Sequence, residues 1–508
     1  MKIRPLPRLS NHFGAIALLI SIAGITSPAM AATDDSNVER GHYLSIMAGC
    51  SACHTAPDGE PYAGGTVLNT PFGKLAAPNI TPDPDTGIGS WSAADFEAAL
   101  RQGKNRNGDP LYPAMPYMHY TKITDSDIDA LWAYVKSLKL VKNEVEVNRL
   151  PFPFNVRSSL YVWQELYFEP GRFAPDPEKS DLWNRGAYLT AALGHCGSCH
   201  TPRDALGGPI VEQQFKGGPI EEWYAPDISN GKNSVIADWD KAELKDRLSG
   251  AGDQNHVLVG SMRDVGDDLS QISDKDLTAL VTYLKDQPHD NGGSTTTSHP
   301  AEARINPETK KLYQTKCESC HGADGQGTPG IAASLVDAGA VVAEKPYNVI
   351  SVLLEGIAPK GDYGVMPSFS SISDTEIARL TNYVRSSWGN DAPATATPSM
   401  VHAMRQMAKP DPEAVDASVC VNVAKEKVDE KLRARLAELA TRTEISSADA
   451  EPLVARYDEL NPDATRSERL QELAGVLCQE AVKAGAGKSV AILREIELLD
   501  AIVNTGTN

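Results

Sequence analysis

Three segments of the chain repeat a pattern of polar and hydrophobic positions that is typical of a capped amphipathic helix. Each segment begins with Ser or Thr, has an acidic residue three positions later, and continues with apolar residues at helical spacing. The caps are Thr124, Ser273 and Ser373, and only Ser373 is followed by the Glu of a strict capping box. The apolar positions are Ile128, Leu131 and Val135 in the first segment, Leu277, Leu280 and Leu284 in the second, and Ile377, Leu380 and Val384 in the third. We predict three equivalent helices that each close a small helical unit.

Repeats upstream of these helices indicate that the first two units are closer copies of each other than of the third. Residues 40–44 are Arg-Gly-His-Tyr-Leu and residues 185–189 are Arg-Gly-Ala-Tyr-Leu. Further along, residues 77–80 are Ala-Pro-Asn-Ile and residues 225–228 are Ala-Pro-Asp-Ile. The third unit is shorter and has neither repeat. A chain of 508 residues also exceeds what one hydrophobic core usually supports, so several domains are expected.

We predict an all-α protein with three consecutive domains of one type and a small C-terminal helical domain. The domains are expected at 32–145, 181–290 and 304–390, followed by the C-terminal domain at 417–508. Residues 146–180 are rich in proline and aromatic residues and are expected to wrap against the first two domains. Residues 291–303 have the composition of a flexible linker. Residues 391–416 are expected to form another linker, in which Met400, Met404 and Met407 would share one helix face. Such a stripe favours core packing over contact with a partner or a membrane.

Each of the three domains contains a Cys-x-x-Cys-His motif, which is the attachment signature of a c-type haem. Two thiols three residues apart on one helical turn reach both vinyl groups of a single porphyrin, while the following histidine reaches its iron. The cysteines are Cys50, Cys53, Cys196, Cys199, Cys317 and Cys320, and the histidines are His54, His200 and His321. A single motif could be a redox dithiol beside an unrelated histidine, but three copies favour three haem c groups. We therefore expect three cytochrome c domains and an electron-transfer function.

A methionine is expected to be the second axial ligand of each iron, and the candidates are Met115, Met262 and Met366. The second and third units each have a single methionine between the haem motif and the closing helix. The first unit also has Met118, but Met115 lies 61 residues after the motif histidine, close to the 62 residues in the second unit. His119 and His256 lie in the same stretches and remain alternatives. A histidine in place of methionine would lower the haem potential.

The N-terminal residues 1–31 have the composition of a secretory signal. Lys2, Arg4 and Arg8 precede an apolar run from residue 14 to residue 25, and small residues lead to a cleavage site after Ala31. The apolar run is short for a membrane span, which needs about 20 residues. No later segment is long and apolar enough to cross a bilayer. We therefore expect an exported, periplasmic protein without a transmembrane span in the mature chain.

Charge and the remaining cysteines add two expectations. The formal net charge of −19 does not favour nucleic acid, whose phosphates attract Lys and Arg. It could instead steer a basic redox partner or simply keep the protein soluble. Cys420 and Cys478 are the cysteines that the haem motifs leave over, and in an oxidising periplasm such a pair suggests a disulfide. Two buried free thiols are the alternative.

These motifs resemble the three-haem cytochrome c subunit of bacterial membrane-associated dehydrogenases. The resemblance covers about residues 35–390 and rests on the haem motifs, the Arg-Gly-x-Tyr-Leu repeats, Tyr-Pro-Ala-Met-Pro-Tyr at 112–117 and Val-Met-Pro-Ser-Phe at 365–369. It implies a partner dehydrogenase, either a quinoprotein, a flavoprotein or a molybdenum enzyme, that oxidises an alcohol, sugar acid, polyol or aldehyde. Electrons would pass along the haems to ubiquinone or another respiratory acceptor at the outer face of the cytoplasmic membrane. The resemblance also implies peripheral membrane contact and no catalytic site on this chain.

Two features depart from this family. Residues 332–335 are Ala-Ala-Ser-Leu where many relatives have proline before the leucine, so the backbone beside His321 is not predicted. The region after about residue 400 is longer than the short amphipathic tail expected, which keeps a molybdenum partner open. Two other functions also remain as alternatives. One is a multihaem enzyme of the peroxidase or thiosulfate-dehydrogenase type with an open axial site, and the other is a freely diffusing electron carrier.

Overall fold

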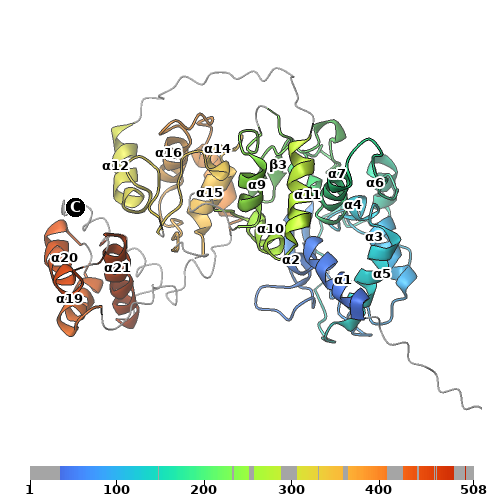
Figure 1. Ribbon diagram of the computed structural model, residues 1–508, viewed down its shortest axis with the longest axis horizontal. Helices are drawn as coiled ribbons and strands as arrows, with labels where there is room; N and C mark the ends of the chain where they lie inside the picture. Colours follow the sequence, from blue (N-terminus) through green and yellow to red (C-terminus); the bar gives the residue numbers. More distant parts are fainter. Residues whose placement is uncertain are drawn as a thin grey trace, which may run out of the picture.

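The computed structural model describes residues 35–146, 148–231, 234–250, 257–287, 306–329, 331–358, 364–408, 427–442, 445–462, 464, 466–484 and 498. Helices dominate this part of the chain, and its strands are confined to two short antiparallel hairpins. The predicted all-α class is therefore confirmed. In Figure 1 the helices from α1 to α11 form one group on the right, those from α12 to α16 lie in the middle, and the C-terminal helices α19 to α21 lie on the left.

The first unit, residues 35–145, packs its helices around the segment that carries the first haem motif. Its helices are α1 (Asp35–Met47), α2 (Cys50–His54), α3 (Ala93–Gln102), α4 (Tyr117–Tyr120) and α5 (Asp125–Ser137). The hairpin of β1 (Val67–Thr70) and β2 (Gly73–Ala76) pairs Val67 with Ala76. The Thr124 side chain accepts a hydrogen bond from the Asp127 N–H, which confirms the predicted cap of α5.

The second unit, residues 181–287, repeats this arrangement. Its helices are α7 (Asp181–Tyr188), a π-helical turn η1 (Leu189–Leu193), α8 (Gly197–His200), a 3₁₀ turn η2 (Val211–Gln213), α9 (Lys241–Leu248), α10 (Ser261–Ser270) and α11 (Asp274–Lys285). Strands β3 (Gly218–Ile220) and β4 (Trp223–Ala225) form its hairpin. The predicted cap of α11 is confirmed, since the Ser273 side chain accepts from the Asp276 N–H.

The glycine of each Arg-Gly-x-Tyr-Leu repeat lies where two helices cross. A Cβ on Gly41 would lie 2.0 Å from the carbonyl oxygen of Ala130 in α5, and one on Gly186 would lie 1.9 Å from that of Ala279 in α11. Real Cβ atoms do not approach backbone so closely. Only glycine therefore lets the N-terminal helix of each unit reach its closing helix.

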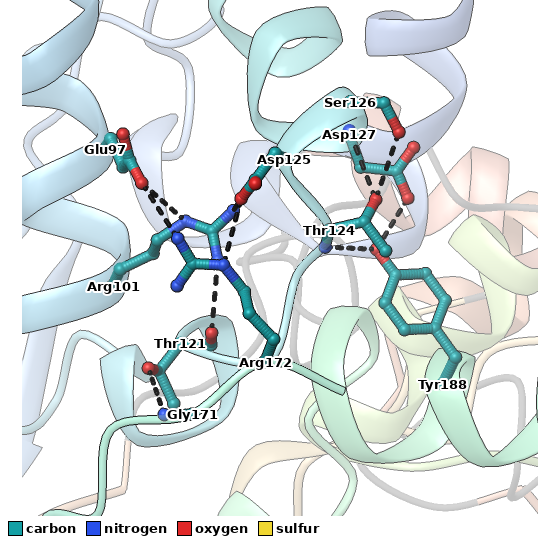
Figure 2. Close-up of polar contacts among 10 residues, drawn as sticks. All are labelled: Glu97, Arg101, Thr121, Thr124, Asp125, Ser126, Asp127, Gly171, Arg172 and Tyr188. Atoms are coloured by element: carbon teal, nitrogen blue, oxygen red, sulfur yellow. Dashed lines mark hydrogen bonds and ion pairs between the residues drawn. The ribbon is translucent and has the colours of Figure 1, made fainter. Parts of the chain in front are cut away.

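The tyrosine of each repeat crosses into the other unit. The Tyr43 hydroxyl donates to Asp276 Oδ2 at 2.7 Å, and the Tyr188 hydroxyl donates to Asp127 Oδ2 at 2.6 Å. The same two carboxylates bind the arginine of their own unit's repeat, Arg40 on Asp127 and Arg185 on Asp276. Figure 2 shows Tyr188 reaching Asp127 and the backbone of Thr124. The two units are thus joined by reciprocal contacts between equivalent residues.

One hydrophobic core runs through both of these units. It contains Leu44, Ile128 and Leu131 of the first unit together with Leu189 and Leu280 of the second. Burial of a side chain of this size stabilises a fold by about 1.5–3 kcal/mol. A continuous core of this kind makes the two units one packed body.

The segment 146–180 contacts both units, as expected from its apolar composition. It contains helix α6 (Ser159–Tyr167), whose Trp163 Nε1–H donates to the Leu206 carbonyl at 3.0 Å and whose Tyr167 hydroxyl donates to Asp204 at 2.7 Å. Further on, Arg172 lies against the first unit, where it contacts Glu97 and Asp125 at 3.2 and 2.9 Å (Figure 2). The segment therefore reinforces the contact between the units.

The third unit, residues 306–408, has a separate core. Its helices are α12 (Pro307–Lys316), α13 (Glu318–His321), α14 (Gly339–Val342), α15 (Tyr347–Glu355), α16 (Asp374–Arg385) and α17 (Pro398–Arg405). The capping box of Ser373 and Glu376 on α16 is present as predicted. Helix α17 lies inside the segment expected to be a linker, and its Met404 is 4% exposed in the third core while Met407 is 41% exposed. Core packing of the methionine stripe is thus observed for Met404, and the third core extends beyond residue 390.

The C-terminal helices α19 (Glu430–Ala440), α20 (Ser447–Leu460) and α21 (Arg466–Lys483) form another core. Cys478 is fully buried there and is disulfide-bonded. Cys420 and the signal at 1–31 lie outside the described residues, so the Cys420–Cys478 pair and the cleavage site stay predictions. None of the helices in the described ranges is long and apolar enough to cross a membrane.

Candidate haem sites

At each haem motif the histidine is held by a hydrogen bond to a backbone carbonyl. His54 Nδ1 lies 2.7 Å from the Pro78 oxygen, and His200 Nδ1 lies 2.8 Å from the Pro226 oxygen. His321 Nδ1 lies 3.0 Å from the oxygen of Ala333. When Nδ1 donates to a carbonyl, Nε2 is left without its proton and can ligate a metal. All three histidines therefore have Nε2 available for a metal.

These acceptors explain the second sequence repeat. Pro78 and Pro226 are the prolines of the Ala-Pro-x-Ile segments, and they occupy equivalent places behind the two histidines. In the third unit, Ala333 supplies the carbonyl from the segment that departs from the family pattern. The missing proline thus leaves the acceptor for His321 in place.

A glycine that sequence reasoning missed lies behind each histidine. Gly64 donates its N–H to the His54 carbonyl at 2.7 Å, and Gly217 and Gly327 make the same contact with their own motif histidines at 2.8 and 2.9 Å. Each has a positive φ, between 75° and 81°. A Cβ on Gly64 would lie 2.4 Å from the Pro78 carbonyl carbon. Glycine is required at this position both by the positive φ and by the close approach of the Pro78 backbone, whose carbonyl accepts from the histidine.

The third site opens into a cavity. His321 and Met366 both line it, together with the two motif cysteines, and Met366 is bridged to Ile357 through two backbone hydrogen bonds. The lining is mostly apolar, which suits a porphyrin. The predicted ligand pair of the third haem is thus brought to one cavity.

Neighbouring parts of the chain close the third site. Val257 and Leu258 of the second unit line the same cavity. Cys320 and Ile331 pack against the core of the C-terminal helices. The C-terminal domain, which had no predicted role, therefore covers one side of the third haem motif.

The remaining axial candidates lie in the regions expected for them. Met115 is partly buried and packs against the core shared by the first two units, and Met262 is the second residue of α10. His119 does not face its own unit's motif. Its Nδ1 lies 3.1 Å from the Ala191 carbonyl, and its ring lies against Gly197 inside the second motif. This position favours Met115 over His119 as a ligand, whereas His256 lies outside the described residues.

The motif thiols lie inside the fold, where attachment to a porphyrin would place them. Burial raises the pKa of Cys50, Cys196 and Cys317 to about 12 in each case. Burial also raises the pKa of Cys199, and the neighbouring Cys53 thiol of the first motif raises it further. The first and second motifs are therefore close neighbours. Oriented histidines and buried thiols fit a c-type haem at each motif, and at the third motif an apolar cavity adds to this fit.

Comparison with known proteins agrees with this chemistry. The sequence model of the cytochrome c family matches residues 38–139 and 308–388. The chain is 35% identical over 426 residues to the fructose dehydrogenase cytochrome subunit of Gluconobacter japonicus. The match covers 77% of this chain and 87% of the relative. It is 33% identical over 429 residues to the alcohol dehydrogenase (quinone) cytochrome c subunit of Gluconacetobacter polyoxogenes. This match covers 79% of the present chain and 91% of the relative. The chain belongs to the cytochrome c subunits of dehydrogenases.

Another relative is much longer than this chain. A nicotinate dehydrogenase subunit of Pseudomonas putida is 36% identical over 383 residues, and the match covers 73% of this chain but only 32% of that protein. The chain thus spans about a third of the length of that relative. Family membership makes this protein a c-type cytochrome with an electron-transfer role, as the motifs predict.

Proposed function

We propose that this cytochrome subunit contains three cytochrome c domains, binds one haem c at each, and transfers electrons from a partner dehydrogenase to ubiquinone or another respiratory acceptor. The observation that carries the proposal is the common geometry of the motifs, in which His54, His200 and His321 each bind a carbonyl and a glycine lies behind them. When bound, the haems supply the one-electron chemistry. The chain orients the ligands, excludes water from the iron and sets the local charge.

Met115, Met262 and Met366 are proposed to complete the three ligand sets. The cavity shared by Met366 and His321 supports this assignment for the third haem. The place of His119 against the second motif supports Met115 in the first unit. Iron with two protein ligands has no open position for a substrate, which favours electron transfer over peroxidase chemistry.

Three relatives support a dehydrogenase as the partner. Their names specify fructose, alcohol and nicotinate as substrates, so the partner's substrate class stays open. We propose that the protein is exported through residues 1–31 and works at the outer face of the cytoplasmic membrane, where ubiquinone is accessible. A Cys420–Cys478 disulfide, supported by the bonded state of buried Cys478, would then form in the periplasm.

Mass spectrometry of the exported protein tests the first part of the proposal. We expect the mass of the cleaved chain plus three haems, and fewer than three would contradict the assignment of the motifs. The oxidised protein should show the weak near-infrared methionine-to-iron band for every haem. A high-spin haem at rest would instead favour a multihaem enzyme.

Copurification tests the partner. When the tagged protein is expressed from the genome of its native organism, a dehydrogenase should copurify with it. The complex should reduce a quinone analogue with one substrate in a screen of alcohols, sugars, sugar acids, aldehydes and nicotinate. Purification of the chain alone, with no activity regained on mixing with candidate dehydrogenases, would support a free electron carrier.

A further inference from the structure

Helix α10 of the second unit lies over the haem motif of the first. A Cβ on Gly49, the residue before the first motif, would lie 3.9 Å from Asp268 Oδ2. Asp264 lies one turn earlier on the same face of α10. The second unit therefore brings carboxylates to a site that the first unit builds.

Among the described residues, three carboxylates add charge beside the first motif. Asp268 raises the pKa of Cys50 in addition to burial, and Glu221 and Asp264 do the same for Cys53. Glu221 is fixed by a hydrogen bond from the Asn69 N–H at 3.0 Å, which holds it beside the first unit's hairpin. All three carboxylates come from the second unit.

The second motif has a cation in the corresponding place. Arg203 donates from Nη2 to the Ser198 carbonyl at 2.9 Å, between the two motif cysteines, and from Nη1 to the Gly207 carbonyl at 2.8 Å. Its charge opposes the rise that burial causes in the pKa of Cys199, to which Glu221 also adds, so Glu221 is a neighbour of both motifs. Asp227 also lies near His200, but Lys216 lies 3.9 Å from this carboxylate and offsets its charge.

We propose that Asp264 and Asp268 of the second unit lower the redox potential of the first haem, and that Arg203 raises that of the second. This inference rests on the proposed three-haem function. An oxidised haem carries one more positive charge than a reduced one, so nearby carboxylates stabilise the oxidised state and a guanidinium destabilises it. The effect should be largest for Asp268, which is partly buried, because salt and water screen charge poorly there, whereas Asp264 and Arg203 are exposed.

A direction for electron transfer follows from this asymmetry. An electron on the first haem moves downhill to the second, whose motif is its close neighbour through Cys53 and Cys199. One electron leaves the iron of the first site and arrives at the iron of the second, with no bond broken and no proton transferred. The first haem is therefore the electron donor of this pair.

Asp268→Asn and Asp264→Asn in the full-length holoprotein test the proposal. Haem content is first verified by mass spectrometry, and the three potentials are then measured by spectroelectrochemical titration near pH 8. Burial and the charges of Asp264 and Asp267 raise the pKa of Asp268 to about 6, so it is ionised under these conditions. Each variant should shift one potential upward, that of the first haem, and leave the other two unchanged.

Asp267→Asn is the matched control, because it removes the same charge from an exposed position on the same helix. Arg203→Gln should shift a different potential, and in the downward direction. If neither Asp264→Asn nor Asp268→Asn moves any potential more than Asp267→Asn does, the proposal is wrong. A protein with fewer than three haems would contradict the proposed function instead, so the two failures are distinguishable.

Discussion

Replacing Tyr188 by Phe removes one hydroxyl group from the contact between the first two units and keeps the aromatic ring. This hydroxyl donates to Asp127 Oδ2 at 2.6 Å and accepts from the Thr124 N–H at 3.2 Å (Figure 2). Tyr188 is 5% exposed and Asp127 is 1% exposed, so water cannot replace the lost group. The substitution therefore tests how much the reciprocal contact stabilises the shared body.

The expected loss follows from the charge and burial of the partner. A hydrogen bond to a charged group contributes about 1.5–3 kcal/mol, and a buried group left without a partner adds to the cost. Arg40 still neutralises Asp127 in the variant, which limits the penalty. We expect Tyr188→Phe to lower the free energy of unfolding by about 2 kcal/mol. Tyr43→Phe, at a less buried position, should cost about 1 kcal/mol.

Denaturant unfolding of the holoprotein measures this difference. The circular dichroism of the helices and the methionine-to-iron bands report on all the units, and the transition that Tyr188→Phe shifts should carry the first two units together because they share a core. Tyr161→Phe is the control, since its hydroxyl lies on an exposed side chain and contacts the Gly108 carbonyl at 3.3 Å. If Tyr188→Phe shifts the transition no more than Tyr161→Phe, or if the two units unfold separately, the reasoning is refuted.

Three other predictions concern the haem sites and pH. Gly64→Ala should abolish stable attachment of the first haem, whereas Gly108→Ala, at a similar φ of 84° in open space, should keep all three, as counted by mass spectrometry. Burial would raise the pKa of Asp276, but Arg185 holds it below its usual value, so this carboxylate stabilises the fold above about pH 4 and the stabilisation is lost as pH falls further. Asp276→Asn should therefore flatten the dependence of the unfolding midpoint on acid pH. Met366→His should lower one haem potential and remove one near-infrared band, and an unchanged spectrum would exclude Met366 as a ligand.

The haem motifs and closing helices were predictable because each depends on local sequence. The caps at Thr124, Ser273 and Ser373 form as their side chains dictate, with the expected helix behind each. The glycines behind the histidines were not predictable from spacing. They lie 10, 17 and 6 residues after their histidines, because loops of different length lead to the same place. These glycines are recognised by their positive φ and by the short distance to a neighbouring backbone, and both exist only in the folded chain.

The contact between the first two units could be predicted from the sequence only in part. The repeats placed Tyr43 and Tyr188 at equivalent positions, but a repeat is equally compatible with contacts inside one unit. The crossing to Asp276 and Asp127 depends on how two folded units pack. The short helix α17 and the core packing of its methionine face were predicted, and Met404 confirms the packing, but the segment was assigned to a linker because nothing in its local sequence showed that it packs into the third core.

The same packing means that the first haem site cannot be understood from the first unit alone. Its motif, its histidine and its acceptor carbonyl come from residues 50–78, yet its charged neighbours Asp264, Asp268 and Glu221 come from the second unit. Removing the second unit would strip away these carboxylates and expose the core face of α1 and α5. An isolated first unit would therefore lose stability and, if it still bound haem, would show a higher potential than in the whole protein. In the proposed electron transfer the first two units therefore work as one body, because the contacts that hold them together also place the charges.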